Sequence, residues 1–173
     1  MEKGYIQLYT GNGKGKTTAA MGLAFRASGC GLKTLMIQFM KGQDTSENKA
    51  AVKSSFINIE QYGLKEFFVE TKSDIIGHRG ECRKALNRAA EVLKTSEYDI
   101  LILDEIINAL KYNLVSFEEV IELINAKPEK IEMILTGRDA PEALYEYCDL
   151  ITKFDEVKHY YKSGVNARKG IEF

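Results

Sequence analysis

A glycine-rich segment at residues 10–18 has the residue types and the spacing that suit the binding of a chain of phosphates. Its sequence is TGNGKGKTT. The glycines would let the backbone turn its N–H groups inward toward phosphate oxygens, while the lysine supplies a mobile cation and the following threonine offers a hydroxyl to Mg²⁺. The segment is therefore predicted to be a nucleotide-binding P-loop, with contacts from Gly11, Asn12, Gly13, Lys14, Gly15, Lys16, Thr17 and Thr18.

The surroundings of this segment support the P-loop prediction. A strand-like run precedes it, and a helix is expected from Lys16, whose positive N-terminal end favours anions. The usual pattern has a glycine where this chain has Thr10, and here the glycine falls one residue later, at Gly11. The alternative is a glycine-rich turn without a ligand. The strand, the glycines, the Lys-Thr pair and the helix together favour phosphate binding.

Two carboxylates end the most apolar run of the chain and are the candidate metal ligands. Asp104 and Glu105 follow residues 100–103, which read as a buried strand. In a parallel sheet the carboxyl ends of neighbouring strands converge on one crevice. Side chains alternate along a strand, so one carboxylate should reach Mg²⁺ directly or through water, and the other should bind a loop. The pattern does not say which does which, and a solvated acidic turn is the alternative.

A basic residue follows another strand-like run and is expected at the same edge of the sheet. Arg138 comes directly after residues 133–137, whose sequence is MILTG. A guanidinium group there could neutralise phosphate charge through a pair of hydrogen bonds. Most arginines are simply solvated, but the turn at Thr136 and Gly137 favours a role in the site.

Short apolar runs that alternate with helical stretches must position these groups. This order indicates an α/β protein with a mostly parallel central sheet flanked by helices, the three-layer P-loop NTPase fold of RecA-like type. Strands are expected at residues 5–10, 33–40, 56–61, 99–105, 132–136 and 150–157. Helices are expected at 16–28, at 73–94, after a capping box formed by Ser116 and Glu119, and at 142–148, with an irregular tail after 158.

Length and charge set the class of protein. The 173 residues, 1–173, fit a single domain, in which roughly 70% of the unfolded surface would be buried on folding. Lys and Arg number 24 against 25 Asp and Glu, without the basic excess of a dedicated nucleic-acid binder. The basic stretch at 79–94 is interrupted by Glu81 and Glu91, which favours a solvated helix.

Cysteine and histidine usage indicates a reducing compartment and no zinc site. Cys30, Cys82 and Cys148 are far apart, and neither His78 nor His159 has a partner at ligand spacing. No signal peptide is recognisable, and no apolar stretch approaches the ~18 residues of a membrane span. We therefore expect a cytoplasmic protein without a membrane partner.

Together these motifs resemble the P-loop family of ATP:corrinoid adenosyltransferases, also called cob(I)alamin adenosyltransferases. The resemblance covers most of the chain, and the position of Gly11 is itself similar to the usual form of this family. A P-loop alone is shared by many functions, whereas this ordered set of motifs is specific. The matching segments are 9–20, 38–42, 103–105, 109–112, 135–138, 157–159 and 164–173.

The resemblance implies an unusual use of the P-loop. The family binds ATP in the reverse orientation, and the Co(I) of a reduced corrinoid attacks the ribose C5′ carbon, so that triphosphate leaves. Catalytic roles are implied for Lys16, Glu105 and Arg138, and a Mg²⁺ site for Thr17, Glu105 and Asp104, some of them through water. The substrates would be ATP and cobalamin, cobinamide or a cobyrinate derivative, in the synthesis or salvage of adenosylcobalamin.

The resemblance also implies an aromatic contact to the corrinoid. The family displaces the lower axial ligand of cobalt with bulky aromatic residues in the segment that corresponds to 67–71, which indicates Phe67 and Phe68. Val69 stands where well-studied relatives have tryptophan, and the chain contains no tryptophan. Phe68 or Tyr62 could compensate, and the alternative is that both phenylalanines are ordinary core residues.

The sequence also leads to expectations about partners and leaves two rival functions open. The resemblance implies a homodimer and an electron donor such as a reduced flavoprotein. One rival is a P-loop ATPase or kinase that cleaves at the γ-phosphate. The other is a non-catalytic module that binds ATP or a corrinoid.

Overall fold

The computed structural model describes residues 1–65, 68 and 71–172 of the chain. Within these residues, six strands form a single sheet in the order β3-β2-β4-β5-β1-β6, and every neighbouring pair is parallel. A parallel sheet needs crossover connections, and the alternating helices provide them. The strands are β1 (Ile6–Thr10), β2 (Thr34–Phe39), β3 (Ile57–Tyr62), β4 (Ile100–Asp104), β5 (Glu132–Thr136) and β6 (Leu150–Lys153).

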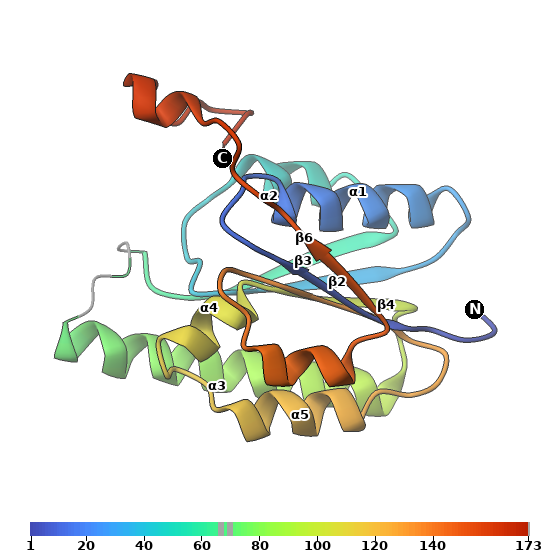
Figure 1. Cartoon of the computed structure of the whole chain (residues 1–173). Helices are drawn as coiled ribbons and strands as arrows, with labels where there is room; N and C mark the ends of the chain where they lie inside the picture. The colour runs from blue at the N-terminus through green and yellow to red at the C-terminus, as the bar shows by residue number, and fades with distance from the viewer. Residues whose placement is uncertain (66–67, 69–70, 173) are drawn as a thin grey trace.

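Helices cover both faces of this sheet and give the molecule three layers (Figure 1). The helices α1 and α2 lie on one face, while α3, α4 and α5 lie on the other. The predicted α/β fold with three layers is confirmed. The helices are α1 (Lys16–Ser28), α2 (Ser46–Ala51), α3 (Lys72–Thr95), α4 (Ile106–Lys111) and α5 (Phe117–Asn125), with the 3₁₀ helices η1 (Glu142–Tyr147) and η2 (Tyr160–Ser163).

The central strands are buried on both faces, which explains their nearly continuous apolar sequences. Every residue of β2, β4 and β5 is buried. Because side chains alternate along a strand, neighbouring residues enter opposite layers. Leu101 and Leu103 pack into the core beneath α3 and α5, whereas Ile100 and Ile102 pack into the core beneath α1.

Strand order brings the predicted site segments to one edge of the sheet. β5 lies between β1 and β4, and β2 lies on the other side of β4. The P-loop follows β1, the two carboxylates end β4, and Arg138 follows β5. Since all these strands are parallel, their carboxyl ends open on the same side of the molecule.

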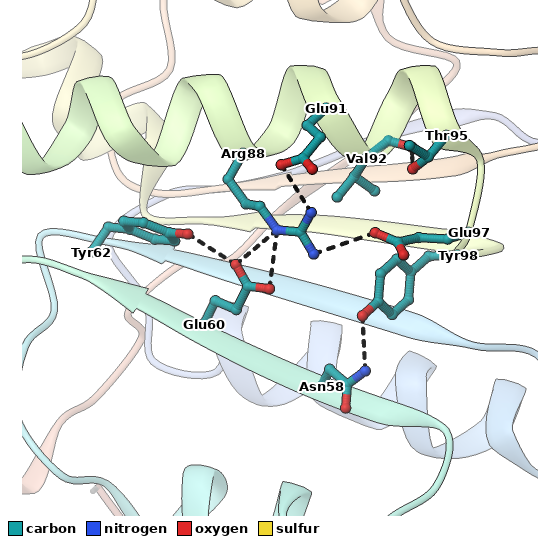
Figure 2. A network of polar contacts seen from close by, with 9 residues as sticks. All are labelled: Asn58, Glu60, Tyr62, Arg88, Glu91, Val92, Thr95, Glu97 and Tyr98. Atoms are coloured by element: carbon teal, nitrogen blue, oxygen red, sulfur yellow. Dashed lines mark hydrogen bonds and ion pairs between the residues drawn. The ribbon is translucent and has the colours of Figure 1, made fainter.

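A charged network fastens helix α3 to the edge strand β3 (Figure 2). The Arg88 guanidinium donates to both oxygens of Glu60 at 3.1 Å and also pairs with Glu91 and Glu97. The Tyr62 hydroxyl donates to Glu60 at 2.9 Å. The network holds the end of β3, which leads into the loop at Gly63 and Leu64.

Several predicted elements differ from the observed ones. Helix α3 begins at Lys72, after the N-cap Thr71, whose side chain accepts a hydrogen bond from the Asp74 N–H. It continues through Gly77, where a side chain would meet Leu64 Cδ1 at 2.8 Å. The region 142–148, predicted as a helix, forms the 3₁₀ helix η1, whereas β6 ends at Lys153 rather than at 157. The tail predicted as irregular contains the short η2.

Two short helices, α2 and α4, were not predicted. Each has 6 residues, too few to show a helical period in the sequence.

Among the described helices, none combines the length and the apolar character that a membrane crossing requires.

Candidate active site

The loop between β1 and α1 has a backbone that only glycine could adopt at two points. Gly11 has φ 101° and Gly15, the N-cap of α1, has φ 115°. A side chain at position 11 would come within 2.4 Å of the Phe154 carbonyl oxygen, which already accepts a 2.7 Å hydrogen bond from the Gly13 N–H. The glycines therefore serve both the turn and its close packing against Phe154, just beyond β6.

Lys16 is buried within this loop, with 6% of the residue exposed. Its ammonium group donates to the carbonyl oxygens of Gly11 at 2.6 Å and Gly13 at 2.9 Å. Burial lowers the pKa of Lys16, and the charge of Arg138 adds to this, while the charge of Glu105 opposes it. The ammonium lies across the loop, where a phosphate oxygen could replace the carbonyl oxygens as its acceptor.

Asp104 is fully buried, and both oxygens of its carboxylate accept hydrogen bonds. Its Oδ1 accepts 2.8 Å hydrogen bonds from the hydroxyls of Thr17 and Thr136. Its Oδ2 accepts from Gln38 Nε2 at 3.1 Å and from Lys41 Nζ at 2.8 Å. Burial alone would raise the pKa of Asp104, but the charge of Lys41 and these hydrogen bonds outweigh it and hold the pKa below its ordinary value. The carboxylate is therefore ionised and holds Thr17 in place.

Glu105 differs from Asp104 because its side chain has an unused oxygen. The residue has φ 65°, a left-handed conformation that is rare for a non-glycine residue, and its N–H donates to Thr136 Oγ1 at 2.9 Å. Within the described residues, no donor reaches its buried Oε2 atom. Burial and the charge of Asp104 raise the pKa of Glu105. A cation would compensate this carboxylate.

These oxygen groups suit a magnesium ion. Mg²⁺ prefers hard oxygen ligands and is commonly held by one or two carboxylates together with the phosphates of a nucleotide. Thr17 and Glu105 line the same cavity, and Asp104 lies behind Thr17. Among the described residues, no group of three or more His, Cys, Asp and Glu side chains could hold a metal ion. The unpartnered Glu105 oxygen and the Thr17 hydroxyl fit a cation that shares its ligands with phosphate.

Arg138 is presented to the same cavity by a tight turn after β5. Its N–H donates to Asn108 Oδ1 at 2.7 Å. The preceding Gly137 has φ 146°, and a side chain there would come within 2.6 Å of Ile107 Cβ. The exposed guanidinium group has no hydrogen bond or ion pair with any other part of the chain that the structure describes. It is free to bind an anion.

The predicted nucleotide contacts surround one cavity of about 320 Å³, with the exception of Gly11. Glu105 and Arg138 line the same cavity, and Asp104 lies buried behind it. The structure thus brings together the groups predicted from three separate motifs. Lys41, to which the sequence analysis assigned no role, also lines this cavity. The signal available for it was the matching segment 38–42, which contains it and lies at the end of β2.

An apolar pocket of about 420 Å³ adjoins the cavity of about 320 Å³ at the P-loop, which is called the phosphate cavity below. Met40, Leu64 and Phe68 contribute its apolar side chains, and the Phe68 ring packs on those of His78 and Tyr112 at centroid distances of 5.2 and 4.8 Å. Lys41 and Glu172 line both the pocket and the phosphate cavity. The two sites therefore share a wall.

The aromatic predictions have different outcomes in this pocket. Phe68 lines it, whereas Phe67 and Val69 lie outside the described residues. Tyr62 does not line the pocket, because its hydroxyl is engaged with Glu60 in the network beside α3. Among the described residues that line the pocket, Phe68 is the one that was suggested to compensate for the tryptophan that the chain lacks.

The C-terminal segment contributes Glu172 to the lining of the cavity, a position that was not predicted for it. Lys14 Nζ donates to the Ile171 carbonyl oxygen at 3.0 Å and lies 3.6 Å from Glu172 Oε1. Glu172 in turn accepts hydrogen bonds from the Tyr160 hydroxyl and from Arg168, and these lower its pKa to about 2. The tail is thus fastened beside the P-loop.

Comparisons with known proteins point to one family. A family model described as ATP:corrinoid adenosyltransferase BtuR/CobO/CobP matches residues 2–173. A corrinoid adenosyltransferase of Sinorhizobium sp is 35% identical over 174 residues, which cover 99% of this chain and 81% of that protein. The corrinoid adenosyltransferase of Escherichia coli (strain K12) is 33% identical over 172 residues, covering 99% of this chain and 87% of that protein.

A solved structure supports the fold. The KaiC-like protein PH0186 from Pyrococcus horikoshii OT3 superposes with a TM-score of 0.55, covering 91% of this chain and 75% of the other, at 18% identity. At this identity the likeness concerns the three-layer architecture alone.

Proposed function

The chain belongs to the family of ATP:corrinoid adenosyltransferases, and from this premise we propose that it transfers the 5′-deoxyadenosyl group of ATP to the Co(I) of a reduced corrinoid. Triphosphate is the second product. The observation that carries the proposal is the wall shared by a phosphate-binding cavity and an apolar pocket. A nucleotide whose phosphates fill the cavity can present its ribose carbon to a macrocycle seated in the pocket.

The reaction is a displacement at carbon. The electron pair of Co(I) forms the Co–C5′ bond, the C5′–O5′ bond breaks, and its electron pair remains on the α-phosphate of the departing triphosphate. Cobalt is formally oxidised from Co(I) to Co(III), and no proton has to move. The protein therefore needs no nucleophile or general base of its own. Its tasks are to align the two substrates and to stabilise the charge of the leaving group.

Residues of the phosphate cavity supply that stabilisation in our proposal. Lys16 exchanges its loop carbonyl acceptors for phosphate oxygens, and the free guanidinium of Arg138 binds the triphosphate from the β5 side. Thr17 and Glu105 would hold Mg²⁺, with Asp104 orienting Thr17. When bound, Mg²⁺ would neutralise part of the triphosphate charge.

The apolar pocket is proposed to take one face of the corrinoid. Phe68, held by His78 and Tyr112, would lie against the macrocycle where water or a lower ligand of cobalt would otherwise bind. Phe67 is a further proposed corrinoid contact. Exclusion of a lower ligand makes Co(II) easier to reduce, which is why an aromatic wall suits this reaction.

The finer assignments are also proposals. Cobalamin, cobinamide and a cobyrinate derivative such as cobyrinic acid a,c-diamide are the proposed corrinoids, in the synthesis or salvage of adenosylcobalamin. A reduced flavoprotein is the proposed electron donor, and the protein is proposed to act as a cytoplasmic homodimer. Membership of the family does not favour the rivals, cleavage at the γ-phosphate and non-catalytic binding.

An anaerobic assay with a strong chemical reductant tests the proposed function. With ATP, Mg²⁺ and Co(I)-cobalamin or cobinamide, we expect the Co(I) absorbance to disappear and a light-sensitive alkylcorrinoid to form. Triphosphate should accumulate in equal amount. Accumulation of ADP with unchanged cobalt absorbance for every corrinoid tried would contradict the proposal. A reaction without ATP controls for reoxidation of cobalt.

A further inference from the structure

We propose that Lys41 is a further catalytic residue, whose ammonium group leaves Asp104 when ATP binds and contacts the α-phosphate next to the breaking C5′–O5′ bond. The inference rests on the proposed function, because only cleavage at C5′ places new charge on that phosphate. No sequence motif assigned a role to Lys41.

The position of Lys41 sets it apart from the other cations of the site. Lys14, Lys16 and Arg138 line the phosphate cavity alone, whereas Lys41 lines both that cavity and the apolar pocket. Among the described residues, it is the only cation at the shared wall. A nucleotide that spans from the cavity to the pocket has its α-phosphate and ribose at this wall. Lys41 is therefore the cation nearest the bond that breaks.

The local backbone is built to hold Lys41 at this wall. Met40 has φ 58°, a left-handed conformation that a non-glycine residue seldom adopts, and it redirects the chain as β2 ends. A side chain at Gly42 would lie 2.4 Å from the Gly63 carbonyl oxygen, and one at Gly63 would lie 2.5 Å from the Lys41 backbone nitrogen. The loops after β2 and β3 thus pack backbone to backbone. This packing fixes the base of the Lys41 side chain while its end remains movable.

The geometry allows the ammonium group to change partners. It lies 2.8 Å from Asp104 Oδ2, and 29% of the Lys41 side chain is exposed, whereas that of Asp104 is fully buried. When Lys41 leaves, Asp104 still accepts hydrogen bonds from Thr17, Thr136 and Gln38. The carboxylate is then not stripped of donors, and the ammonium exchanges one oxyanion for another.

The exchange serves the chemistry at the moment of bond breaking. As the C5′–O5′ bond breaks, its electron pair passes to O5′, and the α-phosphate gains one negative charge. A cation already placed beside that phosphate stabilises the transition state more than the ground state. Removal of the Lys41 charge should therefore lower kcat much more than it weakens ATP binding.

The first test compares Lys41→Met and Lys41→Arg with Lys94→Met, a control at an exposed position of α3. With saturating Co(I)-cobalamin, kcat of Lys41→Met is expected to fall by about tenfold or more, while the ATP dissociation constant changes less than about threefold. Lys41→Arg should recover part of kcat, and Lys94→Met should match the unaltered protein. Thermal unfolding of each variant checks the fold.

A second test uses adenosine 5′-O-(1-thiotriphosphate). It distinguishes a direct contact between Lys41 and the α-phosphate from an indirect, structural effect of the substitution. Sulfur replaces one oxygen of the α-phosphate, so a residue that touches that oxygen is sensitive to the replacement. We expect the ratio of the rates with ATP and with one thio-diastereomer to be larger for the unaltered protein than for Lys41→Met. If Lys41→Met does not fold, Lys41→Gln takes its place in both tests.

The outcomes of these tests separate the two proposals. An unaltered protein that forms no adenosylcorrinoid overturns the proposed function and this inference together. The role of Lys41 alone is overturned if the unaltered protein forms the product and Lys41→Met keeps the same kcat. The same holds if Lys41→Met has the same ratio of rates with ATP and with the thio analogue, for both diastereomers. If Lys41→Met loses as much ATP affinity as it loses kcat/KM, Lys41 binds the ground state and the transition state equally well and is not a catalytic residue.

Discussion

Replacement of Lys16 with alanine is expected to slow adenosyl transfer by about a hundredfold or more. Lys16 is 6% exposed, and its ammonium group is held by the Gly11 and Gly13 carbonyl oxygens inside the loop that must receive the triphosphate. One preorganised donor in a site that excludes water contributes ~3 kcal/mol to a transition state that gains negative charge. The loss should appear in the single-turnover rate with Co(I)-cobalamin.

The structure supplies a control for this variant. Lys94→Ala removes a lysine from the exposed surface of α3 and is expected to leave the rate unchanged. The fold of Lys16→Ala should be retained, because Lys16 and one of its two acceptors, Gly13, line a cavity of about 320 Å³ that water can enter. A folded Lys16→Ala protein with a rate within about threefold of the unaltered one would contradict the assigned role.

Asp104→Asn is expected to cost about 2–3 kcal/mol of stability at neutral pH. The carboxylate is fully buried and pairs with Lys41, so the variant leaves this ammonium without its partner and turns an amide N–H₂ group toward existing donors. Breaking a buried pair costs about 3–5 kcal/mol, and the 29% exposure of the Lys41 side chain places the value below that range. Urea unfolding measures the difference, and activity should also fall because Thr17 loses its acceptor.

The effect of pH has a definite sign at this position. The charge of Lys41 and the hydrogen bonds overcome the opposing effect of burial, so the folded state lowers the Asp104 pKa below its value in the unfolded chain. The stabilisation is therefore complete above the unfolded pKa of about 3.9 and is lost as the pH falls through the lower, folded pKa. The stability gap between Asp104→Asn and the unaltered protein should be largest at neutral pH and should shrink below about pH 4.

A matched control uses an exposed ion pair. Asp44 lies 2.7 Å from Lys49, and both side chains are mostly exposed. Asp44→Asn should change the free energy of unfolding by less than about 1 kcal/mol at any pH. Two results would contradict the role assigned to the buried Asp104 carboxylate. One is an equal loss of free energy of unfolding in Asp44→Asn and Asp104→Asn. The other is a stability difference between Asp104→Asn and the unaltered protein that does not shrink at low pH.

The P-loop and the sheet could be predicted because their signals are local. Helix α1 spans Lys16–Ser28 and β5 spans Glu132–Thr136, as predicted. The glycine run with its Lys-Thr pair and the apolar strand can each be recognised in a short stretch of sequence. The capping box at Ser116 and Glu119 also forms as predicted. The 3₁₀ geometry of η1 could not be predicted because it depends on packing rather than on composition.

The division of labour between the two carboxylates could not be predicted. Alternation along a strand shows only that Asp104 and Glu105 point differently. The structure adds the left-handed backbone of Glu105 and the four donors gathered on Asp104 from three other segments of the chain. Both features depend on which strands become neighbours.

No role was predicted for Lys41 or Glu172, for the same kind of reason. Lys41 reaches Asp104 only because β2 and β4 are adjacent, and Met40 adopts a conformation that its sequence does not indicate. Glu172 reaches the P-loop only because the tail returns and is fastened by Tyr160 and Arg168. Long-range contacts of this kind leave no periodic trace in a sequence.

The most direct measurement of the central claim uses an ATP analogue whose β- and γ-phosphates are joined by nitrogen. This analogue resists cleavage at the γ-phosphate but retains an ordinary C5′–O5′ bond. With Co(I)-cobalamin we expect it to form adenosylcobalamin and to release intact imidotriphosphate, at a rate within about tenfold of that with ATP. If ATP yields ADP and phosphate while the analogue yields no cobalt–carbon bond, the reacting atom is the γ-phosphorus and the account is wrong.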